Sequence, residues 1–404
     1  MREFDIIIFG ASGLTGRYAI EELSHCVNKP PGIKWAIAGR NIEKLKSALT
    51  SVQEYLPQGI DIRNIPIIKA DTQDPSSVHK MCKRTRLLLN CVGPYLDSVQ
   101  AKYFKAAREA GVYVVEACGI GSLPTDYGIA LLMKKFPGGL NSVEYFVEFL
   151  EGPRGRSTGY GTFSSGVHSL IDYFKSSKFE QQVKENVFKK DPVKSIYLMN
   201  KLIKKSLVIY SRKERALCLK YVGPDVRTIK RSQMFRANFL NKETLIETNG
   251  YLKPNSVFAA FLHIYVSILF TLMCLFAVGR FLMERYPSFF TAGLFTKTGP
   301  SREQILEGGT RITFYAEGWK NKVEESVKQT TRPDKRLKMV VTGQEPAYAF
   351  TAVCMVQACL TVLFENKKIP LEGGVYTPGV AFEDTSMQER LEKRGATFTF
   401  EEVE

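Results

Sequence analysis

The sequence has few of the residues that build metal sites and disulfide frameworks. Its four histidines lie far apart, and none of its eight cysteines forms a C-x-x-C pair. Because zinc sites need closely spaced Cys or His ligands, we predict no metal site. An apolar strand is expected to begin at Phe4, which leaves no length for a signal or transit peptide. We therefore expect free thiols in a reducing compartment and a protein that is not secreted.

No nucleic-acid-binding motif accompanies the excess of positive charge. The net charge is +15, and residues 184–236 contribute most of it, with 15 Lys or Arg against 4 Asp or Glu. Aromatic residues are sparse in this basic stretch and form no RNA-stacking pattern. We predict no nucleic-acid partner. Lys and Arg beside an apolar segment are instead attracted to the headgroups of anionic lipids.

Residues 257–279 contain no charged residue. As a helix this segment would span about 34 Å, which is enough to cross the hydrocarbon core of a bilayer. Lys253 and Arg280 flank it, and residues 280–290 add aromatic and cationic side chains typical of a membrane interface. We predict attachment to a membrane or lipid surface; the alternative is a helix buried between domains.

A single crossing of a bilayer is not expected for this apolar segment. Residues 310–319 and 338–342 have the pattern of strands that need partners upstream of residue 257, so one crossing would divide their domain. We favour a segment that enters and returns, or lies in one leaflet, which also suits the monolayer of a lipid droplet. A second apolar stretch, residues 347–364, has small residues at helical spacing and is predicted to be a core helix.

The first sixteen residues predict a strand that runs into a phosphate-binding turn. Residues 4–9 are an apolar run rich in Ile, and glycines follow at every third position. Such glycines allow a tight turn, close approach of the backbone to a pyrophosphate, and close packing of helix on strand. A helix expected over residues 14–26 would point its free N–H groups at the phosphates. The alternative is an ordinary glycine-rich turn. The predicted contacts are Gly10, Ser12, Gly13, Leu14, Thr15 and Gly16.

The ends of three further predicted strands supply the rest of a dinucleotide site, because ligands of open parallel sheets bind beyond the carboxyl ends of the strands. A strand over residues 34–39 ends at Arg40. NAD-selective sites place an acidic residue there, whereas Arg suits a 2′-phosphate, so NADPH is predicted over NADH. The alternative is a merely solvated arginine. The other predicted contacts are Asp71 with the adenine, and Asn90, Val92 and Gly93 with the nicotinamide ribose.

Alternating strands and helices with short connections predict an α/β fold with a Rossmann, doubly wound parallel sheet. We expect this dinucleotide-binding domain over residues 1–140. A second α/β domain over 141–345 opens with a half-exposed strand and carries the basic stretch 184–236 and the apolar segment 257–279, an expected membrane-associating helix. Residues 346–404 are expected to form a C-terminal helix and tail that return to the Rossmann domain.

Five motifs are spread over the chain, at residues 10–16, 35–40, 90–95, 122–128 and 373–379. Together they resemble the saccharopine dehydrogenase-like oxidoreductases, a branch related to saccharopine dehydrogenases and trans-acting enoyl reductases. The resemblance implies an N-terminal Rossmann domain, an α/β substrate domain and a C-terminal helix that returns to the Rossmann core. Animal members of this branch are associated with lipid droplets and membranes, as the apolar segment suggests. The resemblance implies no substrate.

The chain departs from the family pattern after Tyr95. The family continues with a Gly-Glu-Pro turn, a helix and a strand, whereas here residues 96–100 lead directly into the following helix. One strand and one helix of the Rossmann domain are therefore expected to be missing. Ile120 and Gly121 also replace a Phe-Asp pair. Both changes fall on the active-site side of the sheet, which puts the nicotinamide and substrate pocket in doubt but not the phosphate site.

These features predict an NADPH-linked oxidoreductase that acts on a lipid-related substrate at a membrane or lipid-droplet surface. The alternative is a catalytically inactive, cofactor-binding scaffold on the same surface. No catalytic acid or base stands out. Tyr95 and Asp126 are candidate proton donors, but a helix-capping or packing role is favoured for each. Whether the protein is a homo-oligomer is left open.

Overall fold

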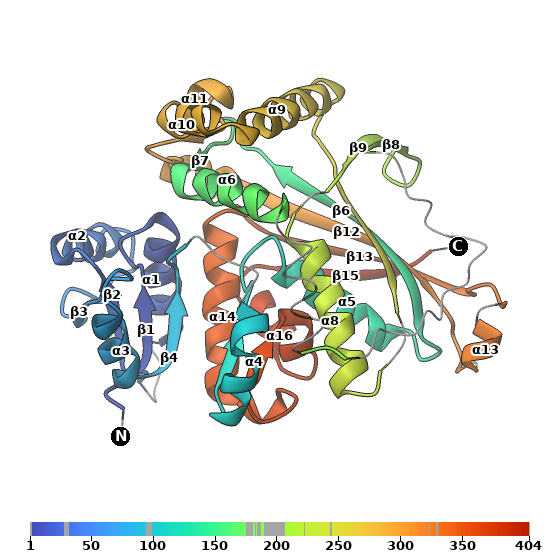
Figure 1. Ribbon diagram of the computed structural model, residues 1–404, viewed down its shortest axis with the longest axis horizontal. Helices are drawn as coiled ribbons and strands as arrows, with labels where there is room; N and C mark the ends of the chain where they lie inside the picture. The colour runs from blue at the N-terminus through green and yellow to red at the C-terminus, as the bar shows by residue number, and fades with distance from the viewer. Residues whose placement is uncertain are drawn as a thin grey trace. The chain divides into compact units, whose positions relative to one another are not determined.

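A computed structural model describes most of the chain (Figure 1). Tyr95 and parts of the basic stretch 184–236 lie outside the described residues. The contacts divide the chain into two compact units, residues 1–95 with 347–366 and residues 96–346 with 367–404. The division thus falls near residue 95, and the domain boundaries expected near 140 and 345 stay predictions. The described residues are 2–27, 32–93, 99–174, 181, 183, 187–189, 207–221, 223–242, 245–322, 324–328 and 330–403.

The first unit contains a four-stranded parallel sheet in the order β3-β2-β1-β4. Its strands are β1 (Phe4–Phe9), β2 (Trp35–Gly39), β3 (Ile67–Lys69) and β4 (Thr85–Asn90). The chain moves outward from β1 to β3 and then returns to the other side of β1, so the direction of strand addition reverses between β1 and β4. This arrangement is Rossmann-like and confirms the predicted fold class.

Four helices complete the first unit: α1 (Leu14–Val27), α2 (Ile42–Gln53), α3 (Pro75–Arg84) and α14 (Ala349–Glu365). Side-chain caps begin two of them, because Asn41 accepts the Lys44 N–H before α2 and Asp74 accepts N–H groups before α3. Helix α14 contacts α1 and β4. Between the two helices, Gln357 Nε2 donates to Glu22 Oε1 at 2.9 Å. The apolar stretch 347–364 is therefore a core helix, as predicted.

The second unit contains a seven-stranded sheet in the order β15-β13-β12-β6-β10-β9-β8, in which only β6 and β10 are parallel. The strand β6, predicted to be half-exposed, has eight buried residues in succession. The prediction was wrong because helix α5 (Leu123–Lys135) packs on β6 and Lys213 pairs with buried Glu144 at 2.7 Å. The strands are β6 (Leu140–Leu150), β8 (Val208–Ser211), β9 (Ala216–Lys220), β10 (Glu247–Leu252), β12 (Gly309–Gly318), β13 (Lys335–Gln344) and β15 (Thr397–Glu402).

A separate parallel pair in this unit joins β5 (Tyr113–Val115) to β14 (Gly374–Tyr376), and a second short pair joins β7 (Thr158–Gly159) to β11 (Phe295–Thr296). Helices α5 and α8 contact each other and the large sheet. Helix α8 is Asp225–Phe239. Besides α6 and α9 to α11, the other described helices of this unit are α4 (Val99–Glu109), α12 (Arg302–Glu307), α13 (Glu325–Lys328), the 3₁₀ turn Asn366–Lys368, α15 (Pro378–Ala381) and α16 (Met387–Glu392).

The apolar segment 257–279 is two helices rather than one. Helix α9 (Val257–Leu275) ends at Phe276, whose backbone is extended, and α10 (Ala277–Arg285) follows directly. The Arg280 guanidinium donates to the Cys274 carbonyl at 2.7 Å, which satisfies one of the last carbonyls of α9. The short helix α11 (Pro287–Phe290) follows. We call α9, α10 and α11 together the apolar hairpin; it lies beside α6 (Tyr160–Phe174) in Figure 1.

Two helices in the described part of the chain are long and apolar enough to cross a membrane, α9 and residues 349–368. The second is mostly buried, whereas only 11% of α9 is. Lys253, which precedes α9, pairs with Glu214 at 2.9 Å and Glu148 at 3.5 Å. Lys253 thus flanks the apolar segment as predicted, and its charge is paired with carboxylates of β6 and of the β8–β9 hairpin.

Candidate functional site

The turn after β1 requires glycine at two positions for packing. Gly10 has φ +85°, and a Cβ there would lie 2.8 Å from Val92 Cγ2. A Cβ at Gly16 would lie 2.7 Å from the Ala11 Cα, so α1 packs on the turn more closely than any side chain allows. Gly13 is different, because it is exposed and its Cβ would meet only Gly10 O, at 3.3 Å. Of the three glycines, Gly13 is the most exposed, and Gly10 is half-buried.

The N-terminus of α1 faces the same turn. The Arg17 N–H donates to the Gly13 carbonyl at 3.0 Å, which starts the helical hydrogen-bond pattern. The earlier N–H groups of the first turn have no partner within a helix and carry its positive dipole end. Ser12, Leu14 and Thr15 are partly exposed there. Such an end binds pyrophosphate through backbone N–H groups.

The parallel register brings the other predicted residues to the same edge of the sheet. Phe9 pairs with both Ala38 and Asn90, and Ala38 pairs with Ile68. The residues that follow these strands therefore leave the sheet side by side, at the carboxyl ends where such sheets bind ligands. The edge includes the reversal of strand order between β1 and β4. The predicted residues at this edge are Gly10, Arg40, Asp71, Asn90, Val92 and Gly93.

Arg40 is the exposed cation of this edge. Its nearest acidic neighbour in sequence, Glu43, pairs with Lys46 at 3.1 Å. Among the described residues, none forms an ion pair or hydrogen bond with the Arg40 side chain that would compete with a ligand. A guanidinium in this position can receive a phosphate on the ribose through bidentate hydrogen bonds.

Asp71 and Asn90, which are predicted to contact the cofactor, also stabilise the turns in which they lie. Asp71 Oδ1 accepts the Gln73 N–H at 3.1 Å, and Asn90 Oδ1 accepts the Val92 N–H at 3.0 Å. Both are turns in which a short polar side chain mimics the backbone. The second turn sets the path of the chain past Gly10, against which Val92 packs. Their contacts with a cofactor stay predictions.

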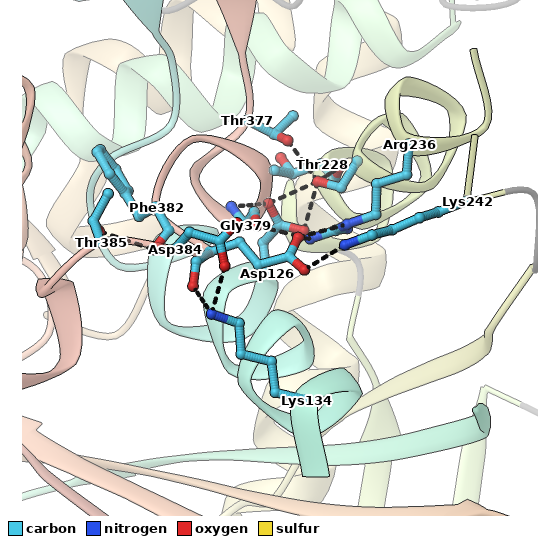
Figure 2. A network of polar contacts seen from close by, with 12 residues as sticks. Asp126, Lys134, Thr228, Arg236, Lys242, Thr377, Gly379, Phe382, Asp384 and Thr385 are labelled. Carbon is cyan, nitrogen blue, oxygen red and sulfur yellow. Dashed lines mark hydrogen bonds and ion pairs between the residues drawn. The ribbon is translucent and has the colours of Figure 1, made fainter. Parts of the chain in front are cut away.

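Asp126 has the packing role that the sequence favoured. Its two carboxylate oxygens lie 2.7 and 2.8 Å from the Ser232 hydroxyl, which donates to them, and Oδ2 also accepts a hydrogen bond from the Gly379 N–H at 2.6 Å (Figure 2). Ser232 in turn lies 2.6 Å from Thr377 Oγ1. Burial raises the pKa of Asp126, while the charge of nearby Arg236 opposes that rise. The carboxylate thus joins α5, α8 and α15.

The rest of the network in Figure 2 is also fully paired. Arg236 donates to Glu383 Oε2 at 3.1 Å and to the Gly379 carbonyl at 2.7 Å. Lys242 reaches the other Glu383 oxygen at 2.9 Å, and Lys134 reaches Asp384 at 2.9 Å. A buried network whose members all have partners stabilises one packing arrangement. It leaves no free group for chemistry at Asp126.

Sequence reasoning missed a second acidic side chain beside this network. Asp225 is the first residue of α8 and is 1% exposed. It accepts a hydrogen bond from Thr125 and lies near Tyr221 and Tyr145. Burial raises the pKa of Asp225 to about 6. The Gly-Pro-Asp sequence at residues 223–225 was its only local signal, and it predicts a turn rather than a site.

Comparison with known proteins points to one family. The family described as the saccharopine dehydrogenase NADP binding domain matches residues 6–131. A human saccharopine dehydrogenase-like oxidoreductase is 29% identical over 428 residues, 98% of this chain and 97% of that protein. A Caenorhabditis elegans lipid droplet localized protein is 30% identical over 440 residues, 99% of each chain.

One solved structure supports the fold. Apo histidine-tagged saccharopine dehydrogenase (L-Glu forming) from Saccharomyces cerevisiae superposes with a TM-score of 0.51 over 99% of this chain and 100% of that chain. The sequences are 11% identical, so this likeness concerns the fold alone.

Proposed function

The chain belongs to the saccharopine dehydrogenase-like oxidoreductases, and we propose that it is an NADPH-dependent oxidoreductase acting on a lipid-related substrate at a membrane or lipid-droplet surface. One observation carries the proposal. The open glycine, Gly13, lies at the N-terminus of α1, on the sheet edge that also holds Arg40.

The residues of this edge fit the parts of NADPH. Backbone N–H groups of the turn and of the first turn of α1, from Ser12 and Leu14 to Gly16, would hold the pyrophosphate, with Gly10 and Gly13 shaping the turn, and Arg40 would hold the 2′-phosphate. Asp71 would face the adenine, and Asn90, Val92 and Gly93 the nicotinamide ribose. When bound, the nicotinamide supplies hydride chemistry. The chain's part is to hold the dinucleotide, orient its ring and exclude water.

The apolar hairpin α9–α11 supports action at a lipid surface. Its large side chains point outward: Phe258 is 77% exposed, Phe281 67% and Phe289 82%. Contiguous exposed apolar surface of this kind marks a protein or membrane interaction site. The strands before and after the hairpin, β10 and β12, both pair with β6. Both flanks therefore stay on one side of the lipid, which supports a segment that enters and returns or lies in one leaflet.

The alternative, a catalytically inactive scaffold, has one structural argument in its favour. The sheet that the structure describes in the first unit has four strands, whereas a complete dinucleotide-binding sheet has six. Pyrophosphate and 2′-phosphate contacts come from the strands that are present, so a shortened sheet can bind a cofactor without completing an active site.

Titration of the full chain with NADPH and NADH, followed by nicotinamide fluorescence, tests the proposal. Wild type should bind NADPH more tightly than NADH, and Gly13→Asp should bind neither, because a carboxylate would occupy the phosphate position. Absence of NADPH binding at millimolar concentration would overturn the enzymatic proposal. If NADPH binds but lipid aldehydes, imines and enoyl esters are not reduced, the scaffold is favoured.

Flotation with phosphatidylcholine–phosphatidylserine vesicles tests the lipid surface. The double variant Phe258→Asp, Phe261→Asp should lose vesicle binding. Phe364→Asp is the matched control, since Phe364 is 55% exposed but lies on α14 in the other unit. Equal loss in both variants would contradict a role for the hairpin.

A further inference from the structure

The β8–β9 hairpin of the second unit carries two exposed arginines. Its turn, residues 212–215, has the sequence Arg-Lys-Glu-Arg, and we call it the cationic tip. Arg212 and Arg215 are both exposed. Of the residues that the structure describes, none forms an ion pair or hydrogen bond with either guanidinium. Both charges are therefore available to a partner outside the chain.

The other two residues of the cationic tip hold it against the sheet. Lys213 Nζ pairs with the buried Glu144 of β6 at 2.7 Å and lies over the ring of Tyr315. Both oxygens of Glu214 are occupied, Oε1 by the Tyr315 hydroxyl at 2.9 Å and Oε2 by Lys253 Nζ at 2.9 Å. The one carboxylate of the tip is thus committed to the fold, and the tip presents positive charge to its surroundings.

The backbone at Arg215 makes this arginine unusual. Arg215 has φ +50°, in the left-handed region that favours glycine and asparagine. Glycine would fit this position of the turn with less strain. Strained residues of this kind cluster at functional sites, so the arginine side chain is the feature that needs an explanation.

The strand register places the cationic tip beside the start of the apolar hairpin. β9 runs antiparallel to β10, and Leu219, near the end of β9, pairs with Leu252, the last residue of β10. The start of β9 and the tip before it therefore extend beyond β10, where the chain continues into α9. β9 contacts α9, and the two lie close together in Figure 1. Glu214 of the tip also binds Lys253, which connects β10 to α9.

Large apolar side chains are exposed next to the two arginines. On the β8–β9 hairpin, Leu207 is 73% and Tyr210 66% exposed, and at the start of α9 Val257 is 62% exposed. Residues 257–279 contain no charge. Cations and a tyrosine beside a charge-free apolar helix match the layers of a lipid surface, in which headgroups lie over hydrocarbon. A nucleic acid or an acidic peptide would match the arginines but not the apolar side chains.

We propose that Arg212 and Arg215 bind the phosphate groups of anionic phospholipids, on the same surface into which the apolar hairpin inserts. This inference rests on the proposed function and names the headgroup charge that the surface prefers. The arginines lie at the depth of the phosphates, where guanidinium groups form charge-assisted hydrogen bonds with phosphate oxygens. The apolar hairpin supplies burial in hydrocarbon, and the cationic tip supplies the preference for negative charge.

Flotation of the full chain with two kinds of vesicle tests the inference, phosphatidylcholine alone and phosphatidylcholine with phosphatidylserine. The double variant Arg212→Gln, Arg215→Gly removes both charges, and glycine suits the left-handed backbone at residue 215. Wild type should prefer the phosphatidylserine vesicles by ~30-fold, because each arginine near an anionic surface contributes ~1 kcal/mol. The variant should lose most of this preference, bind phosphatidylcholine as wild type does, and melt no lower than wild type.

The double variant Lys320→Gln, Arg332→Gln is the matched control. Both residues are exposed, and their loss changes the net charge by the same amount. They belong to the connection between β12 and β13, which leaves β12 at Gly318, opposite Leu140 at the start of β6. β10 runs parallel to β6 and leads into α9 at the other end of the sheet. This control should keep the wild-type preference. Added salt should reduce that preference in wild type, because salt screens exposed charges.

The remaining outcomes separate this inference from the proposed function. If the arginine variant keeps the wild-type preference, or the control loses it equally, the inference is wrong, while lost binding of Phe258→Asp, Phe261→Asp still supports a lipid surface. If wild type floats with neither vesicle, both the inference and the lipid surface are wrong. An unchanged vesicle preference together with lost binding of a DNA duplex would assign the arginines to a nucleic acid instead. The assay contains no NADPH, so failure to bind the cofactor overturns the enzymatic proposal alone.

Discussion

Alanine at Gly16 should destabilise the first unit far more than alanine at Gly13. The Cβ at Gly16 would lie 2.7 Å from the Ala11 Cα, and the Gly10 carbonyl is also in contact, so the obstruction is backbone that cannot turn away. At Gly13 the nearest atom is 3.3 Å away. Overpacking costs about 1–3 kcal/mol, and a backbone obstruction places Gly16→Ala near ~3 kcal/mol. We expect Gly13→Ala to cost less than ~1 kcal/mol, the lower end of that range.

The two tryptophans allow each unit to be followed separately. Trp35 lies on β2 in the first unit and Trp319 lies in the second, and both are buried. In a Trp319→Phe background, urea unfolding monitored by Trp35 fluorescence therefore reports the first unit. With a slope of ~2 kcal/mol/M, a loss of ~3 kcal/mol lowers the midpoint by ~1.5 M. Gly13→Ala should keep its midpoint but weaken NADPH binding at least tenfold. Equal midpoints for the two variants would refute the steric argument.

Three further changes test the electrostatics. Arg40→Gln should weaken NADPH binding by ~10–100-fold, since hydrogen bonds to charged groups contribute ~1.5–3 kcal/mol; NADH titration is the control and should not change. The pKa of Asp225 rises from 3.8 to about 6 on folding. Between pH 3.8 and about pH 6 the folded state therefore binds a proton at Asp225 that the unfolded state has lost. The free energy of unfolding should therefore fall as pH rises through this interval, by up to ~3 kcal/mol, in denaturant titrations of wild type but not of Asp225→Asn. Asp126→Ala should lower the free energy of unfolding by ~1–3 kcal/mol, because the buried Ser232 hydroxyl and Gly379 N–H lose their acceptor; an unchanged free energy of unfolding would contradict a packing role.

Local sequence signals predicted the first unit well and the second poorly. The glycine turn and the position of Arg40 follow from a strand, its end and the next helix, which are neighbours in sequence. By contrast, β5 pairs with β14 across some 260 residues of chain, and no local pattern announces that partner. Thr125 and Asp225 likewise meet only through the packing of α8 on α5. Lys253 shows the same limit, since its carboxylate partners come from a neighbouring strand and a hairpin.

Helices α9 and α14 show why apolar composition alone does not locate a membrane segment. α14 packs against α1 and β4, and the side-chain amide of Gln357 in its middle donates a hydrogen bond to Glu22. α9 packs a single stripe, including Phe270 and Cys274, against α6 and α10 and leaves the opposite stripe bare. A helix that crossed a bilayer would meet lipid along its whole length and would carry β10 and β12 to opposite sides. Because both strands pair with β6, crossing by α9 requires the sheet to break, whereas a helix lying in the plane of a lipid surface leaves the sheet intact.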